Sequence, residues 1–321
     1  MLENYLDRLA RANHRVLPTP APLSPPRIVQ AQLKPLPIDP LKIDVIDFLA
    51  LSRCQLQVNI GRRNSALGRM ASASQQLLLD LEFLEHAPDC ILYLRQQGDT
   101  ELADILKDAQ YKRQRSLTKQ LYNAILAGDE WRAFWALPQT LGNYPDSVSG
   151  DPIDALYALA ENAKQWLSGD YRAQNSVFEG HLAALRSGDG GALLRAATHI
   201  DSAMMQANSV LQRDPNQLLC GDQRVPEQVS ISETVINRFF IAEVQPWVAR
   251  VYRRNQNLLA ATAQLEQILG DVLPPDYRLW QSQRDATLAT LSESPRQHVA
   301  QLKYFFSGCP GRLWETASST G

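Results

Sequence analysis

Hydrophobic residues recur at helical spacing along most of the chain. Residues 2–15 carry one apolar face, at Leu2, Tyr5, Leu6 and Leu9. A second stripe alternates spacings of three and four, which is typical of the seam between antiparallel helices, at Leu67, Met70, Ser74, Leu77, Leu81 and Leu84. A third long helix is predicted over residues 100–127. Because the sequence has no apolar–polar alternation long enough for a sheet, we expect an all-α fold.

Eight prolines between residues 18 and 40 interrupt the helical pattern. Proline fixes one backbone torsion and donates no hydrogen bond, so this density excludes a helix or a central strand. The segment is therefore predicted to be an extended, polyproline-like strap. A free linker would be richer in Gly and Ser, so we expect the strap to dock on the body through Leu17, Leu23, Ile28, Val29, Leu33 and Leu36.

Prolines also predict helix boundaries. Asp39 and Pro40 favour a helix start, because aspartate caps the first turn and proline fits there; Leu41, Val45, Phe48, Ser52 and Leu56 would form its stripe. Pro88 is predicted to end the helix that contains residues 67–84, and Pro246 to bend a long helix over residues 232–269. Two separate helices are predicted near the end of the chain, over residues 275–292 and 295–306.

A loop rich in Pro, Gly, Asn and Ser, residues 138–151, is the predicted boundary between two halves. Helices are then predicted over residues 152–168, 171–187 and 191–212. No fixed repeat period accompanies them, so an irregular multi-helix bundle is favoured over a solenoid. The halves, residues 1–145 and 146–321, are either two domains or one continuous domain.

Composition narrows the class of protein. The chain has 321 residues, 45% of them hydrophobic, and a net charge of −2, so it can bury a sizeable core and has no basic excess for nucleic acid. No apolar run is long enough for a transmembrane helix. The first fifteen residues carry frequent charges and lack the apolar core of a secretory leader.

The four cysteines, Cys54, Cys90, Cys220 and Cys309, are too widely spaced for a zinc ribbon or a CxxC redox site. Their even number favours two disulfides, which indicate an oxidising compartment, over four unrelated buried thiols. Three pairings are possible, and we favour Cys54 with Cys90 and Cys220 with Cys309, so that each bridge closes within one half.

No sequence motif indicates a reaction, a metal site or a cofactor. The histidines are scattered, at His14, His86, His181, His199 and His298. The GDGG sequence at residues 188–191 could hold an anion, but it lacks the residues of a P-loop and is better explained as an inter-helix turn. The basic residues of the third predicted helix lie beside Asp104 and Asp108 and predict a solvated, salt-bridged helix face; they are Lys107, Lys112, Arg113, Arg115 and Lys119.

A basic run at residues 61–69 is the best candidate binding site. It combines two glycines and three arginines without an acid, and forked guanidinium groups beside exposed backbone suit a phosphate, a carboxylate or an acidic partner. The competing explanation is that glycine permits close helix packing and that arginine is common at helix ends. The candidate ligand-binding residues are Arg62, Arg63, Asn64, Ser65 and Arg69.

Several stretches resemble an uncharacterised family of bacterial envelope proteins known only as a domain of unknown function. They are LENYLDRLAR, the proline strap, DFLALSRCQLQVNIGRRNSALGRM and LEFLEHAPDC. Family members look like lipoproteins, with a leader and a lipid-bearing cysteine shortly before the LENYL segment. Neither precedes Leu2 in this sequence. The resemblance implies a periplasmic location and a lipid anchor in the precursor, but no activity and no catalytic residues.

Two functions therefore stand as hypotheses. The first is a non-catalytic envelope protein that binds a partner protein or an envelope polymer, without a cofactor. The second is an enzyme acting on a polymer such as peptidoglycan or glycan, with carboxylates brought together from distant helices. A deep cleft with two facing carboxylates would favour the enzyme, and a shallow apolar groove would favour binding.

Overall fold

The computed structural model describes residues 1–19, 24–39, 51, 54–212, 220, 226–307 and 309. Every regular element in this part of the chain is a helix, which confirms the predicted all-α class. The elements are α1 (Leu2–Ala12), η1 (Gln30–Leu33), α3 (Leu56–Asn64), α4 (Ala66–Arg69), α5 (Ala73–Gln96), α6 (Thr100–Ile125), α7 (Asp129–Phe134), α8 (Asp151–Leu167), α9 (Asn175–Arg186), α10 (Gly190–Val210), α11 (Glu227–Val235), the π-helix η2 (Ile236–Val244), α12 (Gln245–Ile268), η3 (Gly270–Val272) and α13 (Pro275–Phe305).

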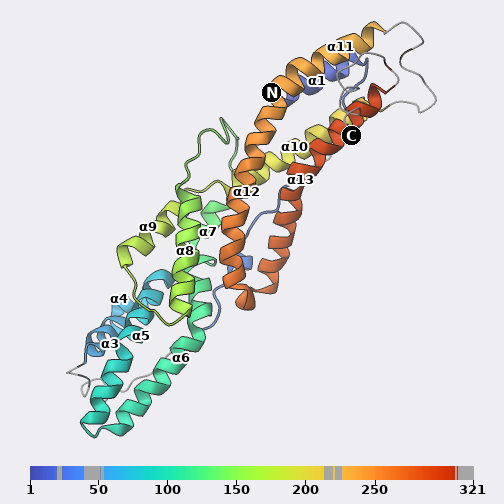
Figure 1. Ribbon diagram of the computed structural model, residues 1–321. Helices are drawn as coiled ribbons and strands as arrows, with labels where there is room; N and C mark the ends of the chain where they lie inside the picture. The colour runs from blue at the N-terminus through green and yellow to red at the C-terminus, as the bar shows by residue number, and fades with distance from the viewer. Residues whose placement is uncertain are drawn as a thin grey trace, which may run out of the picture.

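The helices build an elongated body (Figure 1). At one end α5 and α6 pair as a hairpin, with α3 packed on α5 and α4 in contact with α3. At the other end α1 and α11 lie beside α10 and the last turns of α13. Between them, α8 packs against α9 and α12, and the buried apolar side chains form one cluster that extends from Tyr5 to Cys309. The division near residue 145 into two domains stays a prediction.

The proline-rich segment contains no α-helix over the described residues 24–39, and its one regular element is the short 3-10 helix η1. Ile28 and Leu33 are buried, whereas Val29 is half exposed. The backbone of Leu36 exchanges two hydrogen bonds with the side chain of Asn123 on α6, at 2.7 and 2.9 Å. This segment is thus held against the body, and Leu23 and the helix predicted to start at Asp39 and Pro40 lie largely outside the described residues.

Two predicted helix ends are wrong, because prolines lie inside continuous helices. α5 continues through Pro88 to Gln96, and α13 continues through Pro295 to Phe305. An interior proline removes one backbone hydrogen bond and costs about 3 kcal/mol. In both helices the residues after the proline return to the core, with Cys90, Ile91 and Leu94 buried in α5 and His298 and Leu302 in α13. That burial outweighs the local penalty.

The predicted bend at Pro246 corresponds to a change of helix type. Helical backbone runs from Glu227 to Ile268 without a break, and the nine residues of η2 directly before Gln245 are π-helical. Pro246 is the second residue of α12 and therefore lies inside this continuous helical stretch, where it supplies no backbone N–H for a hydrogen bond. The wider π turns therefore precede the proline and connect α11 to α12.

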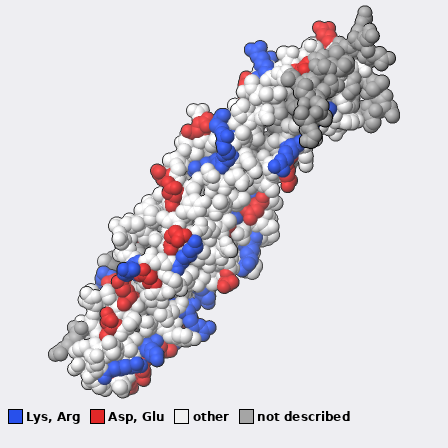
Figure 2. All heavy atoms as spheres, viewed as in Figure 1, with Lys and Arg blue, Asp and Glu red and all other residues white. Residues whose placement is uncertain are grey.

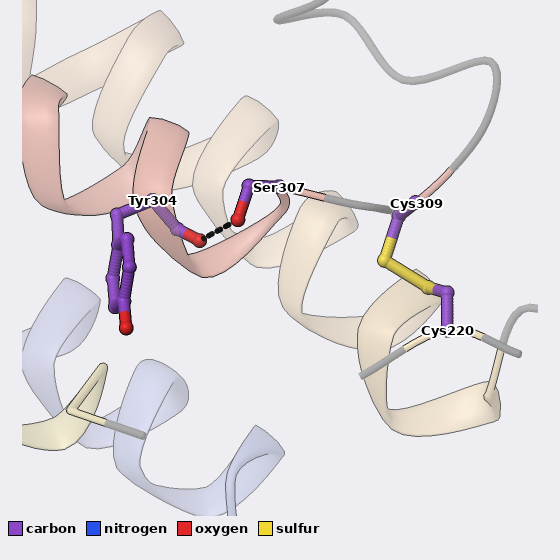
Figure 3. Close-up of a disulfide and its surroundings, with 4 residues drawn as sticks. All are labelled: Cys220, Tyr304, Ser307 and Cys309. Carbon is purple, nitrogen blue, oxygen red and sulfur yellow. Dashed lines mark hydrogen bonds between the residues drawn. A yellow bond between two sulfur atoms is a disulfide. The ribbon is translucent and has the colours of Figure 1, made fainter. Parts of the chain in front are cut away.

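Both favoured disulfides are present. Cys54 pairs with Cys90 on α5, and Cys220 pairs with Cys309 just beyond α13. Figure 3 shows the second bridge beside the end of α13, where Ser307 bonds the carbonyl of Tyr304. The bridges lie at opposite ends of the body. Two structural disulfides fit a protein that works in the periplasm or outside the cell.

The GDGG turn between α9 and α10 is a packing site for α7. A Cβ atom added to Gly191 would lie 1.9 Å from the backbone oxygen of Ala136, and one added to Gly188 would lie 2.0 Å from the ring of Phe134. Because backbone cannot move aside as a flexible side chain does, only glycine fits at residue 191. The turn serves close packing, in line with the explanation preferred from the sequence.

Gly191→Ala is expected to lower the free energy of unfolding by about 1–3 kcal/mol, the usual cost of overpacking a well-filled core. The matched control is Gly180→Ala, since Gly180 lies within α9 and an added Cβ there meets nothing within 4 Å. That variant is expected to be neutral or up to about 1 kcal/mol more stable. Urea denaturation compares them, and equal effects of the two substitutions would contradict the packing role.

A buried histidine joins three helices at the α1 end. His298 on α13 has no exposed surface; its Nε2 lies 2.8 Å from the hydroxyl of Tyr5 on α1, and its Nδ1 lies 2.7 Å from Oδ1 of Asn208 on α10. Asn208 Oδ1 only accepts, so Nδ1 carries the proton and Nε2 accepts from Tyr5. Desolvation by burial lowers the pKa of His298 to about 3.

This histidine predicts a loss of stability in acid. Its pKa is about 3 when folded and about 6.5 when unfolded, so between these values the unfolded chain binds the extra proton and folding is disfavoured as the pH falls. At pH 5 the contribution is about 2 kcal/mol relative to pH 7. The difference in unfolding free energy between pH 7 and pH 5 should therefore be smaller by that amount in His298→Gln. An identical pH dependence in both proteins would contradict the assignment.

Candidate functional site

The predicted basic run forms a short helical hairpin on α5. α3 ends at Asn64, and Ser65 caps the single turn of α4 by accepting a hydrogen bond from the N–H of Gly68 at 3.0 Å. A Cβ atom on Gly68 would lie 2.1 Å from the carbonyl oxygen of Arg62, so glycine allows α4 to fold directly onto the last turn of α3. The hairpin therefore depends on local packing at Gly68.

The two adjacent arginines of this run diverge. Arg62 forms an ion pair with Glu82, and Arg63 forms one with Asp80. Residues 80 and 82 project from different sides of α5, because residues two positions apart in an α-helix are separated by about 200° around the helix axis. The arginines therefore lie in two different hollows on either flank of α5.

The other predicted site residues are used within the hairpin. The guanidinium of Arg69 donates to the backbone carbonyl of Asn64 at 2.7 Å, and the hydroxyl of Ser65 donates to the carbonyl of Arg62 at the same distance. Asn64 and Arg69 remain exposed, and neither lines a described hollow together with Arg63. The five predicted residues thus do not converge on one point. Their role in binding stays a prediction.

An apolar groove lies on the Arg62 flank. It has a volume of about 610 Å³ and runs between the α3–α4 hairpin, α5 and the start of α9. Apolar side chains and glycines supply much of its lining, at Gly61, Leu67, Gly68, Ala71, Leu78 and Leu79. Arg62, Glu82 and Glu179 add charge around it. The groove is an open surface feature, suited to an apolar segment.

The predicted seam beginning at Leu67 is wrong at its first two positions. Leu77, Leu81 and Leu84 are buried as expected, but Leu67 is 85% exposed and Met70 86% exposed. The reason is that α5 begins only at Ala73, where Ser72 caps it by accepting from the N–H of Gln75. Leu67 and Met70 belong to the separate α4 region and project outward.

A basic pocket lies on the Arg63 flank, and sequence reasoning missed its main residues. Asp80 on α5 pairs with Arg63 and also with Arg113 on α6, and both Asp80 and Arg113 are buried. Arg113 was predicted to lie on a solvated face. The available signal was its spacing, since it follows Ala109 by four residues and precedes Leu117 by four in the buried stripe of α6. An arginine in an apolar register indicates a buried charge with a buried partner.

The described residues offer neither a metal-binding cluster nor a membrane-spanning helix. Within the described ranges, no group of three or more His, Cys, Asp or Glu side chains gathers as metal ligands. None of the helices there combines the length and apolar character that crossing a bilayer requires. On the face in Figure 2, acidic and basic side chains alternate along the body.

The fold and these features define an all-helical, disulfide-bonded protein with an apolar groove and a basic pocket on the two flanks of α5. The chain belongs to the family described as a protein of unknown function, DUF3080, which matches residues 2–312. This confirms the resemblance to an uncharacterised family, whose description carries no activity. Comparisons with curated proteins and with solved structures found no match.

Proposed function

We propose that this chain is a non-catalytic envelope protein that binds a segment of a partner protein in the groove beside α4. The observation that carries the proposal is the exposure of Leu67 in a hollow that is also lined by Ala71, Leu78 and Leu79. Large apolar side chains gathered at a concave surface lose unfavourable hydration when a partner covers them.

The charges around the groove define the chemistry of the partner. Arg62 is balanced by Glu82, which also accepts from the side chain of Asn59 at 3.0 Å. Glu179 accepts from the hydroxyl of Ser74 at 2.8 Å and has no ion pair among the described residues. The groove therefore carries one uncompensated negative charge. The matching occupant is an amphipathic segment with apolar anchors and one basic side chain.

The compartment we propose is the periplasm, with the precursor held to a membrane by a lipid anchor. Two disulfides support an oxidising compartment. The anchor follows from the family resemblance at LENYLDRLAR and the stretches after it. Fractionation of cells expressing the natural precursor gene tests this part, and recovery in the cytosolic fraction would contradict it.

The buried carboxylates favour binding over catalysis. Asp80 pairs with Arg63 and Arg113, Asp189 with Arg254, and Glu266 with Arg284. The polymer-cleaving enzyme of the second hypothesis requires two carboxylates that face each other across a substrate. These three are instead held by arginines in pairs that stabilise the fold.

Site-specific photocrosslinking in cells tests the groove. A photoreactive residue at position 67 should give one discrete adduct, and Leu79→Ser with Glu179→Gln should reduce its yield at least tenfold, because both residues line the groove. The control position is 279, because Leu279 is also exposed, at 58%, but lies on α13. The same adduct from position 279, or none from position 67, would contradict the proposal.

A further inference from the structure

The basic pocket on the Arg63 flank is the second hollow of this end of the molecule, and it differs in chemistry from the groove. Its volume is about 460 Å³, and it lies between α5, α6, the end of α3 and residues 37–39 of the proline-rich segment. Five basic side chains line it: Arg63, Lys112, Arg113, Arg115 and Lys119. Three acidic side chains oppose them: Asp39, Asp80 and Asp108. The pocket therefore carries an excess of two positive charges.

Part of this excess positive charge lies at the buried floor of the pocket. Asp80 is 2% exposed and Arg113 is 4% exposed, and one carboxylate there serves two guanidinium groups, those of Arg63 and Arg113. One buried positive charge is left uncompensated, which is costly away from water. Burial, and then the neighbouring Arg63, lower the pKa of Arg113, which reflects the same shortage of negative charge.

Two observations indicate that the missing charge belongs to a ligand. The Nε of Arg113 is buried and has no hydrogen-bond partner among the described residues. At the rim, Lys119 has no acidic partner in the described part of the chain, and Arg115 bonds only the hydroxyl of Tyr111, at 3.3 Å. Lys112 is occupied by Asp108 at 2.6 Å. Donors thus remain available both at the floor and at the rim.

We propose that this pocket binds a phosphate group, held by Arg63 and Arg113 at the floor and by Lys119 and Arg115 at the rim. A phosphate monoester carries a charge of about −1.5 to −2 at pH 7, which matches the excess, and its oxygens suit the planar guanidinium fork. The volume leaves room for the group that bears the phosphate. This site is independent of the groove, which lies on the opposite flank of α5.

Calorimetric titration of the full chain with inorganic phosphate tests the proposal. We expect saturable binding at one site, and at least tenfold weaker binding in Lys119→Gln and in Arg113→Met. Lys119 is exposed, so its replacement leaves the fold intact. Lys107→Gln is the matched control, because it removes the same charge from the same helix outside the pocket, and it should bind as the parent does.

Two further arms separate the sources of the phosphate. Glycerol 3-phosphate represents a free metabolite, and vesicles containing phosphatidic acid represent a lipid headgroup; binding of either with the same sensitivity to Lys119→Gln supports the site. Absence of saturable binding to all three probes would overturn it. An equal effect of Lys107→Gln would also overturn it, since binding would then be a diffuse attraction of charge.

Discussion

Replacing Glu266 by glutamine is expected to lower the free energy of unfolding by about 3–5 kcal/mol, because it removes the buried counter-charge of a buried guanidinium and leaves only the half-exposed carboxylate of Asp285, 2.8 Å away, to pair with it. Arg284 on α13 is 1% exposed and donates to both carboxylate oxygens of Glu266 on α12, at 2.6 and 2.9 Å. Burial by itself would lower the pKa of Arg284, but the Glu266 carboxylate outweighs that effect and the pKa is raised.

The surroundings of this pair leave little room for water to replace the lost charge. The hydroxyl of Tyr277 and the amide of Gln281 each donate to Glu266 at 2.6 Å. The guanidinium of Arg284 lies 5.1 Å from the ring centres of both Trp135 and Trp280. Urea denaturation measures the effect.

The double variant Glu266→Leu with Arg284→Met is the control for this prediction. Removing both charges leaves no buried ion without a partner, so the double variant should lose less stability than Glu266→Gln, although the Tyr277 hydroxyl and the Gln281 amide lose their acceptor. A loss of under about 1 kcal/mol in Glu266→Gln would mean that the pair is not buried as described.

Removing either disulfide is expected to lower the free energy of unfolding by about 4–5 kcal/mol, since the cross-link restricts the unfolded chain. The bridges close loops of 36 and 89 residues, so the second should matter slightly more. The variants are Cys54→Ser with Cys90→Ser, and Cys220→Ser with Cys309→Ser.

Reductant provides the internal control for the disulfide variants. Dithiothreitol should shift the urea midpoint of the parent chain by more than it shifts either double variant, because each variant has only one bridge to lose. A parent midpoint that does not respond to reductant would contradict the stabilising role of both bridges.

Much of the fold could be predicted because local signals and packing agree. The apolar stripe of α6 and its aspartate cap at Asp99, which accepts from the N–H of Leu102, define a helix that the structure places over Thr100–Ile125. The two disulfides formed as favoured from the even number of cysteines and from bridges that close within one half of the chain, although three pairings were possible. For α6 a short stretch of sequence contains the reason for the structure.

The errors arose where distant contacts overrode a local rule. Pro88 and Pro295 weaken their helices locally, but the turns that follow bury apolar residues supplied with partners by other elements. Met70 sits in an apolar register that matches α5, yet the cap at Ser72 separates it from that helix. Helix periodicity alone does not reveal whether the apolar pattern or a local signal, such as a proline or a helix cap, determines where a helix begins or ends.

The candidate site was only partly visible in the sequence for the same reason. The run around Arg62 and Arg63 was predicted as a binding site, which stays a prediction, and the sequence did not indicate its acidic partners on α5. Asp80 and Arg113 each occupy a position in an apolar stripe, and their pairing requires the α5–α6 contact to be known. Charged residues in an apolar register were the signal to follow.

The most direct test of the whole account is the intact mass of the protein isolated from its own cells, with free thiols blocked by an alkylating reagent in denaturant and without reductant. The account predicts that no cysteine is alkylated and that the mass is two pairs of hydrogens below the fully reduced value, because Cys54–Cys90 and Cys220–Cys309 are bonded. Four alkylated cysteines would contradict both the clamped helical body and its place in an oxidising compartment.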